Sequence, residues 1–205
     1  MSFANVSHAD YVKAQLDSES HETYNPMWSE GQRRWVKFLF SPFNRETVIY
    51  DIACGDGIGL IEFGNMGFTN VVGFELNDNK ARIAAASGYK VYLSDKHDLG
   101  MIPEASAHVI YSSHTLEHAR DYELVLNGFK RLLKPLGLLY LILPYPDMGE
   151  KNRQVHCGKY SLGTNIDDDA DTVIERISAC GFDCTNMLFD SAREPEVFLS
   201  FVKRG

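Results

Sequence analysis

The sequence contains only four cysteines in 205 residues, at Cys54, Cys157, Cys180 and Cys184. They are too few and too scattered for the disulfide scaffold of a secreted protein, so we expect reduced thiols. The first residues lack the basic and apolar blocks of a signal peptide. No apolar run reaches the ~18–20 residues that a membrane helix needs, and the longest, 136–144, has the length of a strand. These absences predict a cytoplasmic protein without a membrane span.

Positive charge is also scarce, since 20 Lys and Arg residues face 28 Asp and Glu residues, for a net charge of −8. Nucleic-acid-binding proteins need lysine and arginine to replace the counterions around phosphate, usually in a basic stripe. The densest basic groups, within 33–37 and 130–134, lie on helical patterns and are expected to be solvated helix faces. We therefore expect a small-molecule partner rather than a nucleic acid.

Strand and helix patterns alternate along most of the chain, which predicts a parallel sheet covered by helices on both faces. We expect one α/β domain with a doubly wound, mostly parallel seven-stranded sheet and an antiparallel C-terminal hairpin. Residues 1–46 would form an N-terminal helical cap, with a helix over 28–39, and residues 47–205 the α/β core. Strands are predicted over 48–53, 70–75, 90–93, 109–111, 138–143, 184–189 and 197–203, and core helices over 60–66, 77–88, 121–133 and 171–180.

A glycine-rich loop, Asp51-Ile52-Ala53-Cys54-Gly55-Asp56-Gly57-Ile58-Gly59, follows the first predicted core strand and opens a helix. Such a loop lets a ligand approach the backbone and the free N–H groups of the helix start. A dinucleotide-binding loop requires G-x-G-x-x-G, but Leu60 occupies the third glycine position. The Gly-Lys-Ser/Thr sequence of a phosphate-binding Walker loop is absent. A nicotinamide-dependent oxidoreductase is disfavoured but stays an alternative.

This stretch resembles the class I S-adenosylmethionine-dependent methyltransferases, in particular the small-molecule group with the D-x-G-C-G-x-G loop. The resemblance is close over 47–144, although Ala53 stands where glycine is usual. It implies that Glu75 binds both ribose hydroxyls, a task that suits a carboxylate, and that Ser94-Asp95 lies near the adenine amino group. Taken as a whole, the resemblance implies that the cofactor is bound by Asp51, Ala53, Cys54, Gly55, Gly57, Glu75, Leu76, Ser94, Asp95, Ser112, Ser113 and His114.

The resemblance implies transfer of a methyl group from S-adenosylmethionine to a small-molecule or glycan-like acceptor, with release of S-adenosylhomocysteine. The acceptor would be selected by residues 5–39 and 145–166, the segments least constrained by the family pattern. Tyr24, Trp28 and Trp35 would cover the cofactor or line the acceptor pocket, or simply pack an N-terminal helix. A relative that binds the cofactor without catalysis is a second alternative.

His118 is the candidate general base. It lies just beyond the fourth strand, where ligands gather in parallel sheets, and an imidazole can accept a proton near neutral pH. The competing interpretation is that His118 caps or packs the turn before Asp121. Residues 114–118 also spell the zinc-binding pattern H-x-x-E-H. Because a buried strand leads directly into this pattern and no long helix surrounds it, we predict no metal site.

Overall fold

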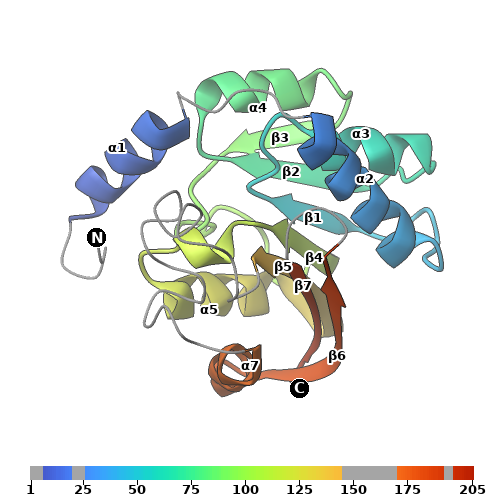
Figure 1. Ribbon diagram of the computed structural model, residues 1–205, viewed down its shortest axis with the longest axis vertical. Helices are drawn as coiled ribbons and strands as arrows, with labels where there is room; N and C mark the ends of the chain where they lie inside the picture. Colours follow the sequence, from blue (N-terminus) through green and yellow to red (C-terminus); the bar gives the residue numbers. More distant parts are fainter. Residues whose placement is uncertain (1–6, 20–25, 145–169, 192–195) are drawn as a thin grey trace.

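The computed structural model describes residues 7–19, 26–144, 170–191 and 196–205. Its centre is one seven-stranded sheet in the order β3-β2-β1-β4-β5-β7-β6 (Figure 1). The strands are β1 (Ile49–Ile52), β2 (Val71–Glu75), β3 (Lys90–Leu93), β4 (Ala107–Ser113), β5 (Leu133–Pro144), β6 (Phe182–Asp190) and β7 (Glu196–Lys203). The helices are α1 (His8–Glu19), α2 (Pro26–Phe40), α3 (Ile58–Asn65), α4 (Asp78–Ala85), the short 3₁₀ turn η2 (Leu116–His118), α5 (Tyr122–Leu132) and α7 (Ala170–Ala179).

Pairing within the sheet confirms the expected topology. Strands β3, β2, β1, β4 and β5 pair in parallel, whereas β7 runs antiparallel to both β5 and β6. From β1 the chain first adds strands on one side, to β3, and then crosses to β4 on the other side. The carboxyl ends of β1 and β4 therefore flank the switch point of the sheet, where open α/β sheets bind their ligands.

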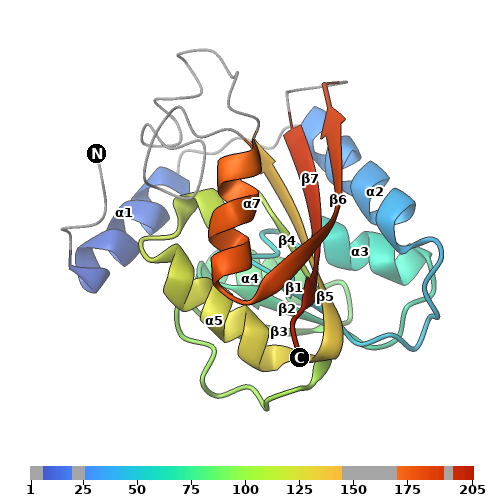
Figure 2. The same ribbon diagram turned by 90° about the horizontal axis from the view of Figure 1, so that it is seen from below.

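Helices cover both faces of the sheet, and Figure 2 shows α5 and α7 on one side with α2 and α3 on the other. The α5 helix illustrates why. Val125, Leu126, Phe129 and Leu132 follow a helical spacing, and all four are fully buried. Asp121 caps the helix by accepting the Leu124 N–H at 2.9 Å. On the opposite face, α2, α3 and α4 pack around Phe40 and Phe63.

Two features differ from the sequence-based expectation. Helix α1 was not predicted, because its polar composition hides a narrow buried face made by Tyr11 and Gln15, one turn apart. Strand β5 starts at Leu133, directly after α5, rather than at residue 138. The pairing of β5 with β4 is irregular at this point, and Leu136 has a φ of 59°. Pro135, near the start of β5, is therefore accommodated at a bulge.

None of the described helices has both the length and the apolar character needed to cross a membrane. Tyr24 and the segment 145–166, which was predicted to select the acceptor, lie outside the described residues.

Candidate active site

The residues singled out in the sequence lie after the carboxyl ends of four neighbouring parallel strands. The glycine loop follows β1, Glu75 ends β2, Ser94-Asp95 follows β3, and Ser113-His114 ends β4. Register brings Asp51 of β1 opposite both Gly73 of β2 and Tyr111 of β4. The candidate residues therefore share one edge of the sheet, around the switch point.

The glycine loop adopts a backbone that favours residues without a side chain. Ala53, Gly55 and Gly57 have φ angles of 58°, 55° and 81°. A Cβ atom on Gly57 would lie 2.8 Å from the Cα of Ala84 in α4, so the loop packs tightly there. A Cβ atom on Gly55 would meet nothing within 4 Å. The space beside Gly55 is therefore open, so that a ligand can approach the backbone there, and we call this space the cradle.

Glu75 holds this loop in place. Its carboxylate is 4% exposed, and it accepts the Gly55 N–H at Oε2 and the Asn77 N–H at Oε1, each at 2.8 Å. A carboxylate oxygen can accept more than one hydrogen bond, so these two contacts are compatible with ligand hydroxyls. A ligand role for Glu75 was predicted from the sequence. In the structure, the Glu75 carboxylate also holds the glycine loop in place.

Asp51 lies beneath the loop and is fully buried. Burial raises its pKa from 3.8 to about 7, and the neighbouring Glu75 carboxylate adds to the increase. Burial likewise raises the pKa of the Cys54 thiol, with further contributions from Asp51 and Glu75. Cys54 is therefore a neutral thiol that packs in the interior. Its Sγ lies 2.9 Å from the position that a Cβ atom on Gly73 would occupy.

Leu60, the residue that breaks the dinucleotide pattern, is fully buried in α3. Its Cδ1 lies 2.9 Å from the position of a Cβ on Gly73. In dinucleotide-binding loops the third glycine permits close packing of helix against strand. In this protein the small residue is Gly73 on strand β2, so helix α3 and strand β2 can pack closely although Leu60 replaces the third glycine.

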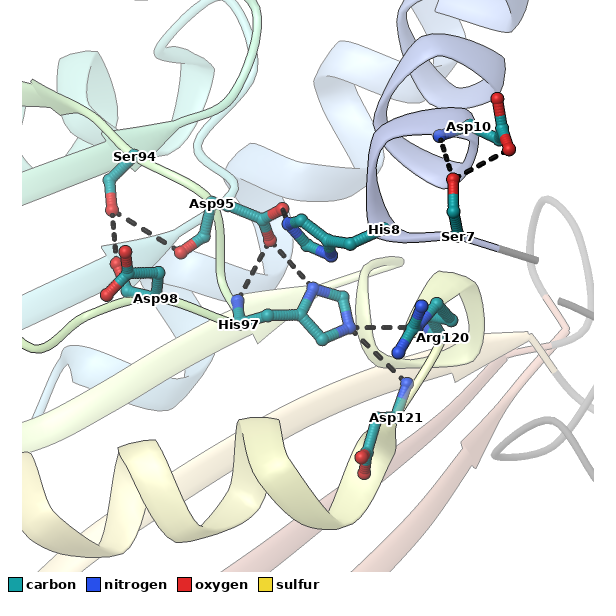
Figure 3. A network of polar contacts seen from close by, with 9 residues as sticks. All are labelled: Ser7, His8, Asp10, Ser94, Asp95, His97, Asp98, Arg120 and Asp121. Carbon is teal, nitrogen blue, oxygen red and sulfur yellow. Dashed lines mark hydrogen bonds and ion pairs between the residues drawn. The ribbon is translucent and has the colours of Figure 1, made fainter. Parts of the chain in front are cut away.

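The Asp95 carboxylate lies beside two histidines (Figure 3). His97 Nδ1 lies 2.7 Å from Asp95 Oδ1, and His8 Nε2 of helix α1 lies 3.2 Å from Oδ2. Burial alone would raise the pKa of Asp95, but hydrogen bonds from the His97 ring and backbone N–H bring the pKa below its usual value. Asp95 is thereby kept as an ionised acceptor. Neither histidine was predicted from the sequence, because no local sequence pattern distinguishes them as site residues.

His114 belongs to a buried cluster at the end of β4. Its side chain is 7% exposed, and its Nε2 lies 3.1 Å from Glu196 Oε1. Glu196 in turn accepts the Trp35 indole N–H at 2.7 Å, and the Trp28 ring meets His114 edge-on with ring centroids 4.4 Å apart. Glu196 was not predicted as a site residue either, although an acidic residue directly before the apolar stretch 197–202 was a visible signal in the sequence.

His118 lies on η2 and is 25% exposed at the side chain, whereas Glu117 beside it is fully buried. The Glu117 Oε1 atom lies 3.7 Å from both His118 Nε2 and His114 Nδ1. The two histidines do not share a helix face as the zinc pattern requires, since His114 lies in the bend directly after β4, with a φ of 50°. In the described ranges, no three His, Cys, Asp or Glu side chains form a group that could hold a metal.

The remaining candidates contribute less directly. Leu76 is half-buried after Glu75, and Ser112 is buried within β4, its hydroxyl without a hydrogen-bond partner among the described residues. The Ser94 hydroxyl donates to the Asp98 carbonyl at 3.1 Å, and the Ser113 carbonyl accepts from Thr115. Of the N-terminal aromatics, Trp35 packs in the core against Phe198.

Comparison with known proteins identifies the class. The family model for the methyltransferase domain matches residues 27–186, and the chain therefore belongs to that family. It is a class I S-adenosylmethionine-dependent methyltransferase domain, and S-adenosylmethionine is the cofactor of this class. The open cradle at Gly55 and the acceptor sites on Glu75 fit that cofactor.

Solved structures share the fold at low sequence identity. A methyltransferase from Mesorhizobium loti is 16% identical with a TM-score of 0.67, over 85% of this chain and 100% of that one. The cyclase SpnF is 12% identical with a TM-score of 0.72, over 99% and 96%. The phospholethanolamine N-methyltransferase 2 of Haemonchus contortus, in complex with S-adenosylhomocysteine, is 14% identical with a TM-score of 0.67, over 85% and 53%. A search of curated proteins gives no match.

Proposed function

We propose that the protein transfers a methyl group from S-adenosylmethionine to a small-molecule or glycan-like acceptor. The observation that carries this proposal is the open cradle at Gly55, whose N–H is held by the buried Glu75 carboxylate. The cradle lies at the switch point of the sheet, where the backbone is accessible and an acceptor of hydroxyl hydrogen bonds is adjacent.

The candidate residues divide the task of holding the cofactor. Glu75 would accept the ribose hydroxyls and Asp95 the adenine amino group, while Gly55 and Gly57 provide the close backbone approach. Ser112, Ser113 and His114 would border the cofactor from β4. When bound, S-adenosylmethionine supplies a methyl group already activated by the positive sulfonium. The protein's own contribution is alignment and exclusion of water, which is worth up to ~7–11 kcal/mol in well-oriented reactions.

His118 would remove the proton from an acceptor hydroxyl or amine. Its ring is partly exposed, and Oε1 of the buried Glu117 lies 3.7 Å from its Nε2. The Haemonchus relative is named for a small phosphorylated amine, which supports a small-molecule acceptor. SpnF is named a cyclase, so a bound cofactor alone does not prove methyl transfer.

The first expected result is that S-adenosylhomocysteine binds at one site per chain in isothermal titration calorimetry. It should also raise the melting temperature, because a ligand that binds only the folded state stabilises it. NADH serves as the control and should do neither. No heat and no thermal shift with millimolar S-adenosylhomocysteine would overturn the proposal. A mass-spectrometric screen for methylated products then tests catalysis separately from binding.

A second expected result concerns the cradle. Gly55→Ala should weaken S-adenosylhomocysteine binding about tenfold or more, because the new methyl group fills space reserved for the ligand. Gly88 provides a matched control, since its φ is +88° and a Cβ there also meets nothing within 4 Å. Both substitutions should cost about 1 kcal/mol of stability, because alanine disfavours a left-handed backbone. Equal binding by the two variants would place the cofactor elsewhere.

A further inference from the structure

His97 occupies a bridging position between two loops at the active edge of the sheet (Figure 3). It lies in the loop after β3, and its side chain is 3% exposed. Its Nδ1 atom lies 2.7 Å from Asp95 Oδ1, and its backbone N–H donates to the same oxygen at 2.9 Å. Its Nε2 atom accepts the Arg120 N–H at 3.2 Å and a longer contact from the Asp121 N–H at 3.4 Å.

These contacts determine which ring nitrogen carries the proton. A backbone N–H can only donate, so Nε2 must be the acceptor and Nδ1 must carry the hydrogen that is donated to Asp95. The ring is also packed edge-on against Tyr11 of α1, with centroids 5.1 Å apart, and Tyr11 is fully buried. His97 is therefore an immobilised donor aimed at one oxygen of Asp95.

The two oxygens of Asp95 therefore differ in the donors that they contact. Oδ1 receives both hydrogen bonds from His97, which leaves Oδ2 for other donors. His8 Nε2 lies 3.2 Å from Oδ2, but the His8 side chain is 51% exposed and comes from a different element. An exposed partner of this kind holds a carboxylate only weakly. Oδ2 is buried and has no hydrogen-bond partner among the described residues, so a ligand that displaces the His8 ring can use this atom.

We propose that His97 is the positioning residue that directs Asp95 Oδ2 toward the adenine amino group of the cofactor. This inference rests on the proposed function, because it takes Asp95 as the adenine-binding acid. His97 contacts no ligand itself. It orients the Asp95 carboxylate and keeps it ionised, and its ring is anchored in turn by the backbone at Arg120.

The amide side chains separate the two contacts of the ring. The amide of asparagine reaches about as far as Nδ1, so His97→Asn can still donate to Asp95. The longer glutamine reaches about as far as Nε2, so His97→Gln can keep the Arg120 contact while the side-chain donor to Asp95 is lost and the backbone N–H donor remains. The two variants are of similar polarity, and each removes one side of the bridge.

The probes are S-adenosylhomocysteine and S-inosylhomocysteine, which carries a carbonyl oxygen in place of the adenine amino group. Wild type should bind the adenosyl compound about ten- to a hundredfold more tightly, the scale of one hydrogen bond to a charged acceptor. His97→Gln should lose most of this preference with little change in the affinity for the inosyl compound. His97→Asn should keep the preference within about threefold of wild type.

Each outcome of the calorimetric titrations decides the matter. An unchanged preference in His97→Gln would overturn the role of His97, and so would an equal loss of affinity for both compounds in both variants, which indicates a general structural effect. If His97→Gln does not fold, His97→Ala replaces it, alone and combined with Asp95→Asn. A preference that His97→Ala still lowers in the Asp95→Asn background would show that the two residues act independently and overturn the inference. Failure of wild type to bind either compound would instead overturn the proposed function.

Discussion

Replacement of His118 by alanine is expected to lower turnover by ~10²–10⁴-fold, the usual contribution of a general base. The affinity for S-adenosylhomocysteine should stay close to that of wild type, because His118 lies on η2, whereas the glycine loop is held by the Glu75 carboxylate at the end of β2. The reason for the loss is positional. His118 lies just beyond the end of β4, beside the buried Glu117, and its ring is partly exposed. Initial rates with an acceptor from the product screen, together with calorimetry, measure both quantities.

The control for this experiment is His108→Ala. His108 lies near the start of β4, at the opposite edge of the sheet, where its ring accepts the Val48 N–H and contacts Lys134. It should keep wild-type turnover at a temperature where the protein is folded. If His118→Ala also keeps wild-type turnover, or if it unfolds, then His118 packs the turn before Asp121 and is not the base.

A second large effect is expected from Asp51→Asn, measured as stability against pH without cofactor. Because the pKa of Asp51 rises from 3.8 to about 7 on folding, the folded protein holds this proton at pH values where the unfolded chain has released it. The Asp51 contribution to the free energy of unfolding therefore falls as the pH rises from about 4 to about 7. Asparagine resembles the protonated acid and does not titrate. Relative to wild type, the variant should gain up to about 4 kcal/mol across this range.

Urea denaturation at several pH values between 4 and 8 measures this difference. Asp56→Asn is the matched control, since Asp56 lies in the same loop but is exposed to solvent. Its stability should stay parallel to that of wild type at every pH. A constant difference between Asp51→Asn and wild type would contradict the raised pKa. The expected gain also explains how a binding-site acid can lower the stability of the ligand-free protein, as functional sites often do.

The glycine loop and the candidate cofactor residues could be recognised locally, because each lies directly after a strand pattern. Glu75 ends the strand 70–75, and Ser94-Asp95 follows the strand 90–93, so sequence position already indicated the carboxyl edge of a parallel sheet. Helix α1 was not visible in this way. Among the α1 residues whose burial is described, 8–17, only Tyr11 and Gln15 are buried, and a stripe so narrow leaves almost no periodic signal.

The sequence by itself determined the class of fold, since alternating strand and helix patterns leave few ways to bury apolar side chains, and it located the loop where the cofactor is proposed to bind. Only the tertiary structure decided what surrounds the candidate catalytic residues. The Trp35–Glu196 hydrogen bond joins residues 161 positions apart, and the His114–Glu196 contact joins residues 82 apart. Such pairs depend on the order and direction of strands. Because β7 runs antiparallel to β5, it brings Glu196 to the edge where the parallel strands end, and no local pattern encodes that arrangement.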